Sequence, residues 1–413
     1  MKRRILLICL CSLFAFCAPA HAQQADTQDR LKALEERIRA LEAELKALKE
    51  GQAAAAALPA AAVPAPPPSA PSAAPQTLGG GGAAMAKILN PDISVIGNFL
   101  GAVGRNTVRP VSSLEMRETE VGFQAVIDPY ARGDFFISFG EEGVALEEGY
   151  ITFTALPGGL VARAGKMRSA FGKVNLLHAH NLPWTDRPLV TENLLGGEDG
   201  ITDAGFSFSR ILPAPKGIFL EATGQVFRGD SGNVFAATRK RDASVVGHLR
   251  GYGDFSESTN LDLGFSYARG HNDLGSDFLT HLYGLDATLR WKPLRRSIYH
   301  SFIARTELVW SQRHQQPSTQ RAFGFFTSAE YRLNRRWTLG GRFDRSEQAR
   351  DASLTDTGFS ALLTYWPSEF SQIRGQYRFA RYAEPGPFDL FRNANELRFQ
   401  FLFVLGAHGA HPF

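Results

Sequence analysis

The chain has 413 residues, and its 45 lysines and arginines nearly balance its 41 aspartates and glutamates, which leaves a formal net charge of +4. Such a balance argues against a nucleic-acid partner, because a nucleic-acid-binding protein would favour a strongly basic chain. No stretch reaches the roughly 18 consecutive apolar residues of a transmembrane helix. The sequence therefore also argues against a helical membrane protein.

Residues 1–22 predict a secretory signal peptide. They begin with basic residues, continue with an apolar run over 5–17 and end in Ala20-His21-Ala22, a small-x-small cleavage site. An uncleaved membrane anchor is the alternative, but the apolar run is shorter than the ~20 residues that a helical span needs. All three cysteines lie in this segment, so the exported protein would have no disulfide, thiolate metal site or cysteine nucleophile.

Residues 23–51 predict a coiled-coil helix that lies in the periplasm and oligomerises the protein. Its apolar residues are alternately three and four positions apart, which is the seam of about three heptads. The seam residues are Leu31, Leu34, Ile38, Leu41, Leu45 and Leu48. A trimer is the favoured assembly, and a lone amphipathic helix is the alternative. Residues 52–87 are rich in alanine, proline and glycine and predict a semi-extended linker.

Residues 88–413 predict an all-β fold, namely a transmembrane antiparallel β-barrel of about sixteen strands. In 281–291, apolar Tyr283 and Leu285 alternate with polar residues such as Asp286, which places the two kinds on opposite faces of a sheet. An apolar outer face and a polar inner face suit a barrel with a wet interior. The expected strands lie near 93–105, 114–128, 131–140, 144–156, 159–172, 201–213, 217–229, 243–256, 259–270, 280–292, 297–313, 320–333, 336–347, 356–367, 370–382 and 396–406.

The connections between the expected strands support this barrel. If the N-terminus is periplasmic, the connections after even-numbered strands are short turns and most of those after odd-numbered strands are long, as in bacterial outer-membrane barrels. The chain ends on Phe413, and a terminal aromatic residue resembles the sorting signal of such barrels. A soluble β-sandwich, whose strands also alternate, is the alternative. Aromatic residues beside the short turns predict an interfacial girdle made of Tyr130, Trp291, Tyr299, Tyr331, Trp337, Tyr365 and Trp366.

The longest connection, residues 173–200, follows the fifth expected strand. Loops of this length are usually functional or disordered, and the many apolar residues of this loop favour an ordered, packed conformation. It is also the third outer loop, which in sixteen-stranded porins folds inward and narrows the channel. Residues 173–200 therefore predict the constriction of a pore, with Lys173, Asp186, Arg187 and Glu192 among its charged residues.

Two stretches resemble a known family. The run GKMRSAFG (residues 165–172) resembles the strand before the constriction loop in phosphate-selective porins O and P. The run LHAHNLPWTDRPLV (residues 177–190) is similar to a branch of that superfamily often labelled zinc-regulated or TonB-dependent receptors, although a helix and a linker are expected here in place of a plug. The resemblance implies a trimeric or monomeric diffusion channel with an anion preference.

Charged residues in the inward phase of the expected strands predict the character of the pore wall. The bases are Arg250, Arg290, Arg305, Arg342, Arg374 and Arg378, with Lys166 and Arg168 beside the loop. The acids are Glu118, Glu120, Glu221, Asp262, Asp286, Glu307 and Glu330. Rings of one sign select ions, and acids and arginines concentrated on different strands would impose a transverse field. We expect a weak anion preference; the alternative is that the charges pair across the lumen and only keep it hydrated.

His178 and His180 are candidate ligands for a divalent metal ion. Two histidines separated by one residue can chelate through their imidazole nitrogens, and Asp186 and Glu192 lie nearby in the sequence. Two hydrogen-bonding loop histidines are the alternative. The sequence has no G-x-S-x-G elbow, no paired-histidine zinc helix and no phosphate-binding glycine loop. We therefore expect neither an enzyme nor a cofactor.

Together these features predict a porin in the outer membrane of a Gram-negative bacterium. Small hydrophilic solutes or ions would diffuse through it passively, with a weak preference for anions. Its expected partners are the lipid bilayer, lipopolysaccharide, the solutes and further copies of the chain, with no nucleic acid. Two alternatives have a different function. One is a structural tether that binds peptidoglycan through the coiled coil, and the other is an uptake channel related to zinc.

Overall fold

The computed structural model describes residues 91–141, 143–385 and 390–406, together with Glu36 and Arg39. Glu36 and Arg39 are helical and exposed. The predicted signal peptide, the leucine seam of the coiled coil, the linker and Phe413 lie outside the described residues. The account that follows therefore concerns the barrel.

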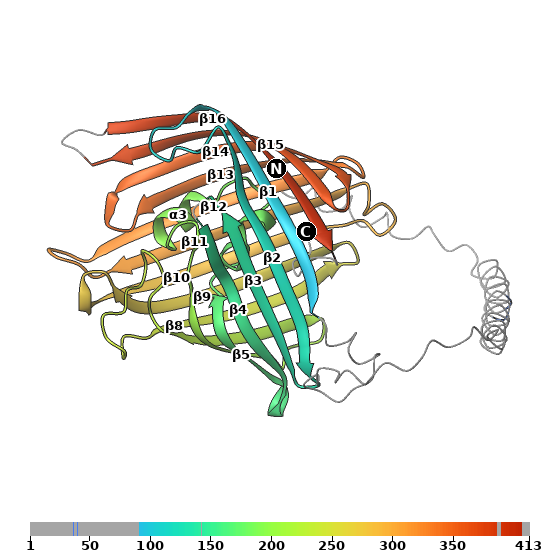
Figure 1. Cartoon of the computed structure of the whole chain (residues 1–413), viewed down its shortest axis with the longest axis horizontal. Coiled ribbons are helices and arrows are strands. Elements are labelled where there is room, and N and C mark those ends of the chain that lie inside the picture. Colours follow the sequence, from blue (N-terminus) through green and yellow to red (C-terminus); the bar gives the residue numbers. More distant parts are fainter. Residues whose placement is uncertain (1–35, 37–38, 40–90, 142, 386–389, 407–413) are drawn as a thin grey trace, which may run out of the picture. The chain divides into compact units, whose positions relative to one another are not determined.

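The described residues form one closed barrel of sixteen antiparallel strands, in which each strand pairs with its neighbours in sequence and β1 pairs with β16 (Figure 1). The predicted fold class and number of strands are confirmed. The strands are β1 (Asp92–Arg105), β2 (Leu114–Asp128), β3 (Ala131–Gly140), β4 (Gly143–Leu156), β5 (Leu160–Arg168), β6 (Thr202–Leu212), β7 (Ile218–Phe227), β8 (Ser244–Ser256), β9 (Thr259–Asn272), β10 (Gly275–Trp291), β11 (Ser301–Arg313), β12 (Gln320–Arg332), β13 (Trp337–Gln348), β14 (Asp351–Ser368), β15 (Ser371–Glu384) and β16 (Leu390–Gly406).

The expected boundaries differ most from the observed ones at the end of the barrel with the long connections. β10 and β14 begin at Gly275 and Asp351, before the positions near 280 and 356 that alternation indicated. A register shift interrupts the regular pairing there, between Gly275 and Leu279 on β10 and opposite Gln348 on β14, so the strands extend beyond the part that alternates regularly. β5, in contrast, ends at Arg168 and not near 172, because the chain turns into the barrel after it.

Alternation along the strands sorts apolar residues outward and polar residues inward. In β10, Leu285 is 45% exposed on the outer face, whereas Asp286 and Thr288 are 4% and 1% exposed on the inner face. An apolar outer surface around a polar lumen is the arrangement that a barrel in a lipid bilayer requires. Among the described residues, no helix is long and apolar enough to cross a membrane.

Glycines allow phenylalanine rings to cover the seam where β1 and β16 close the barrel. Gly97 pairs with Phe403, and Gly101 pairs with Phe399. A Cβ at either glycine would lie 2.1 Å from the facing ring. Because Gly97 and Gly101 have no side chain, rings of β16 can lie over β1 at these two positions. Such aromatic–glycine pairs help to fix the register of neighbouring strands.

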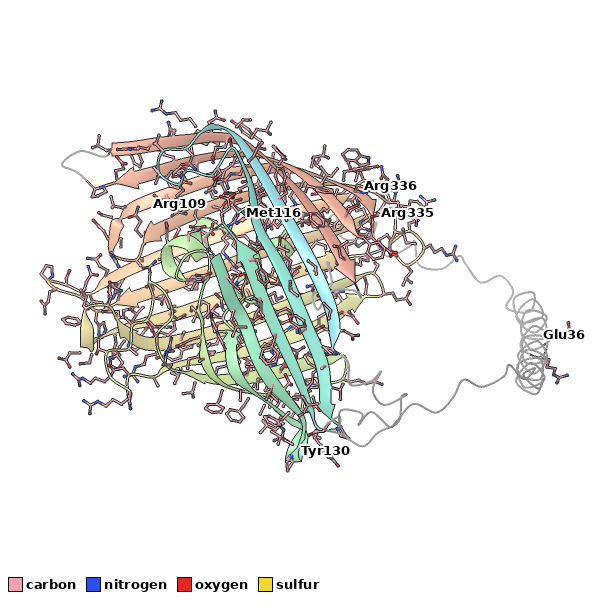
Figure 2. The ribbon with its side chains drawn as sticks, in the orientation of Figure 1. Glu36, Arg109, Met116, Tyr130, Arg335 and Arg336 are labelled. Atoms are coloured by element: carbon pink, nitrogen blue, oxygen red, sulfur yellow. The ribbon has the colours of Figure 1, made fainter. Side chains whose placement is uncertain are left out.

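The two ends of the barrel differ. Short turns follow the even-numbered strands except β10, whose connection to β11, residues 292–300, is longer than expected. Figure 2 labels Tyr130 of the β2–β3 turn and Arg335 and Arg336 of the β12–β13 turn. Trp337 and Tyr365 of the expected girdle stack with ring centroids 4.6 Å apart. Trp366 was wrongly placed in the girdle, because it lines an internal cavity. Trp366 continues the inward phase of Leu362 and Thr364 along β14, so strict alternation already assigned it to the inner face.

Candidate functional site

After β5 the chain leaves the barrel wall and folds inside the barrel. This inward loop, residues 169–201, contains the 3-10 turns η2 (Val174–Leu176) and η3 (Ala179–Asn181) and the short helix α3 (Leu189–Leu194). α3 packs against strands β11 to β14 and is visible within the barrel in Figure 1. Residues 173–200 thus lie in the lumen, where a constriction loop would lie.

Asn175 ties the two ends of the inward loop together. Its buried amide nitrogen donates to the carbonyl oxygens of Ser169 and Ile201 at 2.9 and 3.0 Å. Its Oδ1 accepts the N–H of Ile201 at 2.8 Å. Gly200 makes room for this amide, since a Cβ at that position would lie 2.0 Å from Oδ1. The loop therefore leaves and rejoins the wall at neighbouring points.

An apolar core holds the inward loop against the wall. Trp184 is 0% exposed and meets the ring of Phe326 edge-on, with centroids 5.2 Å apart. The other loop members of this core are Phe171, Val174, Leu182, Val190, Leu194, Leu195 and Ile201, and Val234 and Phe235 of the β7–β8 connection join them. The wall members are Met167, Phe227, Val246, Ala268, Leu282, Val309, Ala322, Phe326 and Leu362. Burial of a large apolar side chain contributes about 1.5–3 kcal/mol, so the loop is a packed part of the fold.

Three polar anchors fix the loop further, and the first lies at its start. The backbone N–H groups of Lys173 and Val174 donate to Glu307 of β11 at 2.7 and 2.8 Å. The Nζ of Lys173 lies 3.0 Å from Asp262 of β9 and 3.5 Å from Asp286 of β10. Burial lowers the pKa of Lys173, and the carboxylates of Asp286 and Asp262 offset part of that effect. Wall acids predicted for the pore thus bind the loop.

The second anchor is Asp186. Its carboxylate forms ion pairs with Arg342 of β13, at 3.0 Å, and with Arg378 of β15, and it accepts a hydrogen bond from Gln376 at 2.6 Å. Arg342 also lies over the ring of Trp184, 4.8 Å from its centroid. Burial alone would raise the pKa of Asp186, but Arg342 and Arg378 hold it well below its ordinary value. Asp186 is therefore a buried anion between two buried cations.

We expect Asp186→Asn to loosen the inward loop, because breaking a buried ion pair from one side leaves uncompensated charge and costs about 3–5 kcal/mol. Faster cleavage of the loop by protease in the folded barrel measures the effect. Asp230→Asn, at an exposed acid, is the matched control. Equal resistance of the wild type and Asp186→Asn would contradict this role.

The depressed pKa of Asp186 also fixes the pH dependence of this anchor. An acid whose folded pKa is lowered contributes stability that is present above its unfolded pKa and lost as pH falls through the folded value. The ordinary value is 3.8 and the folded value lies well below it. We therefore expect the loop of the wild type to resist protease equally at neutral pH and at mildly acidic pH. Release of the loop in mild acid would contradict this prediction.

The third anchor joins the two histidines of the loop to glutamates of the wall. His178 Nδ1 lies 2.6 Å from Glu120 and 3.0 Å from Glu147, and its Nε2 lies 2.8 Å from Glu148. His180 Nδ1 lies 3.1 Å from Glu118. Burial alone would lower the pKa of His178, but its hydrogen bonds to these carboxylates raise it well above the ordinary value.

Asp186 and Glu192, which the sequence offered as further metal ligands, do not join the histidines. Asp186 forms the second anchor, and Glu192 forms an ion pair with Arg109 of the β1–β2 connection at 2.9 Å. Burial raises the pKa of Glu192, and Arg109 offsets part of that rise. The carboxylates beside the histidines come from β2 and β4 because the fold brings distant strands to the loop.

The remaining loop cation, Arg187, binds the loop itself and not the wall. It donates to the carbonyl oxygens of Val174 and Leu177 at 3.2 and 2.8 Å. Burial lowers the pKa of Arg187 to about 10. Arg168 is also buried, with its Nη2 3.1 Å from Glu147. Both residues thus support the loop from within, and neither presents its charge to open space.

Lys166 is wrong as a pore residue. It pairs with Gly149, which in turn pairs with Phe135, and Phe135 is 45% exposed on the outer face. Its Nζ donates to the carbonyl oxygen of Leu146 at 2.6 Å. Alternation along β5 itself gives the outer face, because Lys166 precedes Met167, which is 1% exposed in the core inside the barrel, and the sequence prediction did not follow that phase to the end of the strand.

The other predicted wall bases face inward, and several of them are paired. Arg290 lies 3.5 Å from Asp262, and Arg305 lies 2.7 Å from Glu330. Arg374 is buried, donates to Gln400 at 2.6 Å and has no partner for its Nε among the described residues. These ion pairs join neighbouring strands of the wall, β9 with β10 and β11 with β12.

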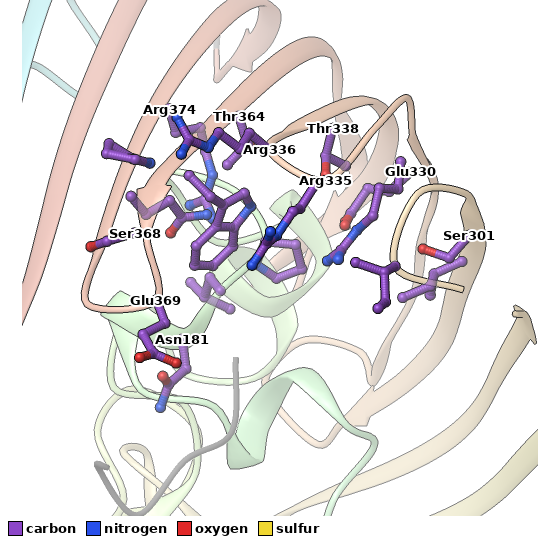
Figure 3. A pocket seen from close by; sticks show the side chains of 18 of the residues that line it. Asn181, Ser301, Glu330, Arg335, Arg336, Thr338, Thr364, Ser368, Glu369 and Arg374 are labelled. Atoms are coloured by element: carbon purple, nitrogen blue, oxygen red, sulfur yellow. The ribbon is translucent and has the colours of Figure 1, made fainter. Parts of the chain in front are cut away.

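A cavity of about 1010 Å³ opens beneath the inward loop, at the end of the barrel with the short turns (Figure 3). Its roof is formed by residues 180–183 of the loop, and its walls come from β11 to β15 and three of the connections at that end. Six basic residues line it, namely Lys292, Arg305, Arg332, Arg335, Arg336 and Arg374. Two acidic residues, Glu330 and Glu369, also line it, so its formal charge is six minus two, or +4, with His180 neutral. We call this cavity the basic vestibule.

Sequence reasoning missed several residues that hold the loop. Glu147 and Glu148 were not considered, although an acidic pair on the strand next to the one that leads into the loop was a usable signal. Arg109 and Asn175 gave no signal, because an arginine in a loop and an asparagine among apolar residues are common. Arg335 and Arg336 were not among the candidate pore residues, and only the structure shows that they line a cavity.

No protein-family model matches the sequence. An uncharacterised protein of Aquifex aeolicus is 28% identical over 393 residues, which cover 79% of this chain and 81% of that protein. Among solved structures, the outer-membrane channel DcaP of Acinetobacter baumannii superimposes with a TM-score of 0.53 at 11% identity, covering 77% of this chain and 97% of that one.

An anion-selective porin from Comamonas acidovorans is similar with a TM-score of 0.52 at 10% identity, covering 77% of this chain and 98% of that one. OprB of Pseudomonas putida has a TM-score of 0.52 at 9% identity, covering 78% of this chain and 95% of that one. The chain thus has the closed sixteen-stranded fold of these outer-membrane channels. Identities this low establish the fold and leave the solute open.

Proposed function

We propose that the protein is a porin of the Gram-negative outer membrane, through which small hydrophilic solutes diffuse passively. A closed barrel with an apolar outer face and a polar lumen suits a bilayer. The inward loop narrows the lumen and acts as the constriction. The observation that carries this proposal is a packed loop inside the barrel, directly above an open, charged vestibule.

The basic vestibule favours anions. Its formal charge of +4 acts inside a protein-walled space, where field lines are focused and counter-ions are concentrated. Arg335 and Arg336 are exposed to this space, whereas Arg305 is paired with Glu330. Pairing reduces the effective charge, which is why we propose a moderate anion preference. The resemblance of residues 165–172 to phosphate-selective porins and the fold shared with an anion-selective porin agree with this direction.

Permeation into proteoliposomes tests the function. Liposomes that contain the folded barrel are mixed with a sugar, a carboxylate and an amine of similar size, and swelling rates are compared with protein-free liposomes. We expect all three solutes to enter, with the carboxylate faster than the amine. Swelling no faster than in protein-free liposomes, with a folded barrel present, would exclude a diffusion channel.

We further propose that the chain assembles as a trimer with a periplasmic coiled coil at residues 23–51. Three barrels held together in a membrane would raise the effective concentration of their short helices, which are marginal alone. Chemical crosslinking of the full chain in membranes tests this, with a variant lacking residues 27–51 for comparison. Weaker crosslinking of the variant supports the proposal. Equal crosslinking, or envelope defects with unchanged solute uptake, would instead favour the tether to peptidoglycan.

A further inference from the structure

Two histidines of the inward loop face four glutamates of the wall deep inside the barrel. His178 and His180 are 0% and 1% exposed. The glutamates are Glu118 and Glu120 of β2 and Glu147 and Glu148 of β4. Glu118, Glu120 and Glu148 are no more than 8% exposed. This histidine–glutamate cluster joins three segments that are distant in the sequence.

The cluster has an excess of negative charge. Arg168 forms an ion pair with Glu147, while Arg117, the next cation, is engaged by Glu198 at 2.6 Å. Three buried carboxylates and the partly buried Glu147 are therefore opposed by one directly paired arginine and the two histidines among the described residues. Buried charge is costly unless it is paired or binds a metal ion. The cluster is thus built to accept further positive charge.

We infer that Glu120, Glu147 and His178 form a divalent metal site that clamps the inward loop to the barrel wall. One carboxylate oxygen of each glutamate and Nδ1 of His178 lie within 4.8 Å of one another. Nδ1 lies 2.6 Å from Glu120 and 3.0 Å from Glu147. Ligands about 2.0–2.1 Å from a tetrahedral ion stand about 3.3 Å apart, so the two distances from Nδ1 would have to widen by about 0.7 and 0.3 Å to admit the ion.

The far side of each imidazole supports this assignment. Nε2 of His178 lies 2.8 Å from Glu148, and Nδ1 of His180 lies 3.1 Å from Glu118. A carboxylate that accepts the N–H of one ring nitrogen leaves the other nitrogen unprotonated for a metal, an arrangement found in most histidine-ligated sites. Glu148 and Glu118 therefore orient the two rings toward the space between them and Glu120.

His180 supplies an independent sign of a missing ligand. Its Nε2 is buried, has no hydrogen-bond partner among the described residues and lies 3.8 Å from Glu120. The rings of His178 and His180 have centroids 5.7 Å apart, close to the roughly 5–6 Å expected when two imidazoles bind one ion. A buried ring nitrogen without a partner is costly, and a metal ion would satisfy it. His180 is the natural fourth ligand.

The donor set indicates the kind of ion. Imidazole suits Zn²⁺, Fe²⁺, Ni²⁺ and Cu²⁺, whereas carboxylates alone would suit Mg²⁺, Ca²⁺ or Mn²⁺. Two histidines with two glutamates therefore favour Zn²⁺ over Ca²⁺ or Mg²⁺. This inference does not depend on the proposed channel function, because the site would fix the loop in any barrel of this structure.

Zn²⁺ titration of the full chain, purified without a polyhistidine tag and stripped with chelator, tests the site by calorimetry. We expect one strong site per chain in the wild type. Glu120→Gln removes a ligand, and we expect its affinity to fall at least as far as that of Glu148→Gln. Glu148→Gln only releases the ring of His178, which costs about 10–100-fold in affinity. His281→Gln is the matched control, since the rings of His281 and His314 also lie close together, with centroids 5.6 Å apart, away from the glutamates.

Visible absorption of bound Co²⁺ in the wild type provides a second measurement that needs no variant to fold. A strong tetrahedral spectrum that Zn²⁺ displaces supports the site. The inference is overturned if the folded wild type binds no Zn²⁺ stoichiometrically and gives no such spectrum. It is also overturned if folded Glu120→Gln retains the wild-type affinity, or if His281→Gln loses it.

Discussion

Replacing residues 176–195 with a short glycine-serine linker increases the single-channel conductance severalfold. The inward loop occupies the lumen as a packed unit, with Trp184 and Leu195 both 0% exposed. Its removal clears this space, while all sixteen strands of the barrel remain paired with their neighbours. A short linker suffices because Asn175 lies at the point where the two ends of the loop meet. Planar-bilayer recording measures the change.

Shortening an exposed connection elsewhere is the control for this change. Residues 316–319, between β11 and β12, are exposed, and their replacement should leave the conductance unchanged. A folded barrel without residues 176–195 that conducts like the wild type would show that the loop is not the constriction. Comparing the two variants shows whether the conductance changes because the lumen is cleared or because any loop has been altered.

Arg335→Glu combined with Arg336→Glu abolishes the anion preference of the channel. Both residues are exposed in the β12–β13 turn and line the basic vestibule. Two charge reversals change the formal charge of the vestibule by four, from +4 to zero. The reversal potential in a salt gradient then moves toward zero. The shift is largest at low salt, because exposed charges are screened over about 8 Å at physiological ionic strength.

A neighbouring turn offers a matched control. Arg295 and Arg296 are also adjacent exposed arginines at the same end of the barrel, but they do not line the vestibule. Arg295→Glu with Arg296→Glu should leave the reversal potential close to that of the wild type. Equal shifts in both double variants would assign the preference to general surface charge. If neither double variant shifts the reversal potential, the vestibule does not determine the ion selectivity of the channel.

The barrel could be predicted from the sequence because its signal is local. Alternation within single strands such as 281–291 follows directly from the pleat of a sheet. Short segments in which the alternation stops indicate the turns between strands. The count of sixteen strands and their order were therefore accessible, and the structure confirms them. Errors arose where the alternation was not followed to the end of a strand, as at Lys166 of β5 and at Trp366 of β14.

The partners of the loop could not be predicted, because they are not local. His178 meets Glu120 across 58 residues, and Asp186 meets Arg378 across 192. Which strand faces a given loop residue depends on how the loop crosses the lumen, and no periodicity records that path. The sequence therefore pointed to the loop that folds inward and to its two histidines, but offered Asp186 and Glu192 as their neighbours in place of the glutamates of β2 and β4.

Recording from the full-length wild type in a planar bilayer with a salt gradient tests the central claim most directly. We predict stepwise, ohmic openings with a reversal potential displaced in the direction of anion permeation, as the inward loop above a basic vestibule requires. A folded barrel that produces no steps would contradict the claim that the protein is a diffusion channel. Steps with a reversal potential on the cation side would contradict the role assigned to the vestibule.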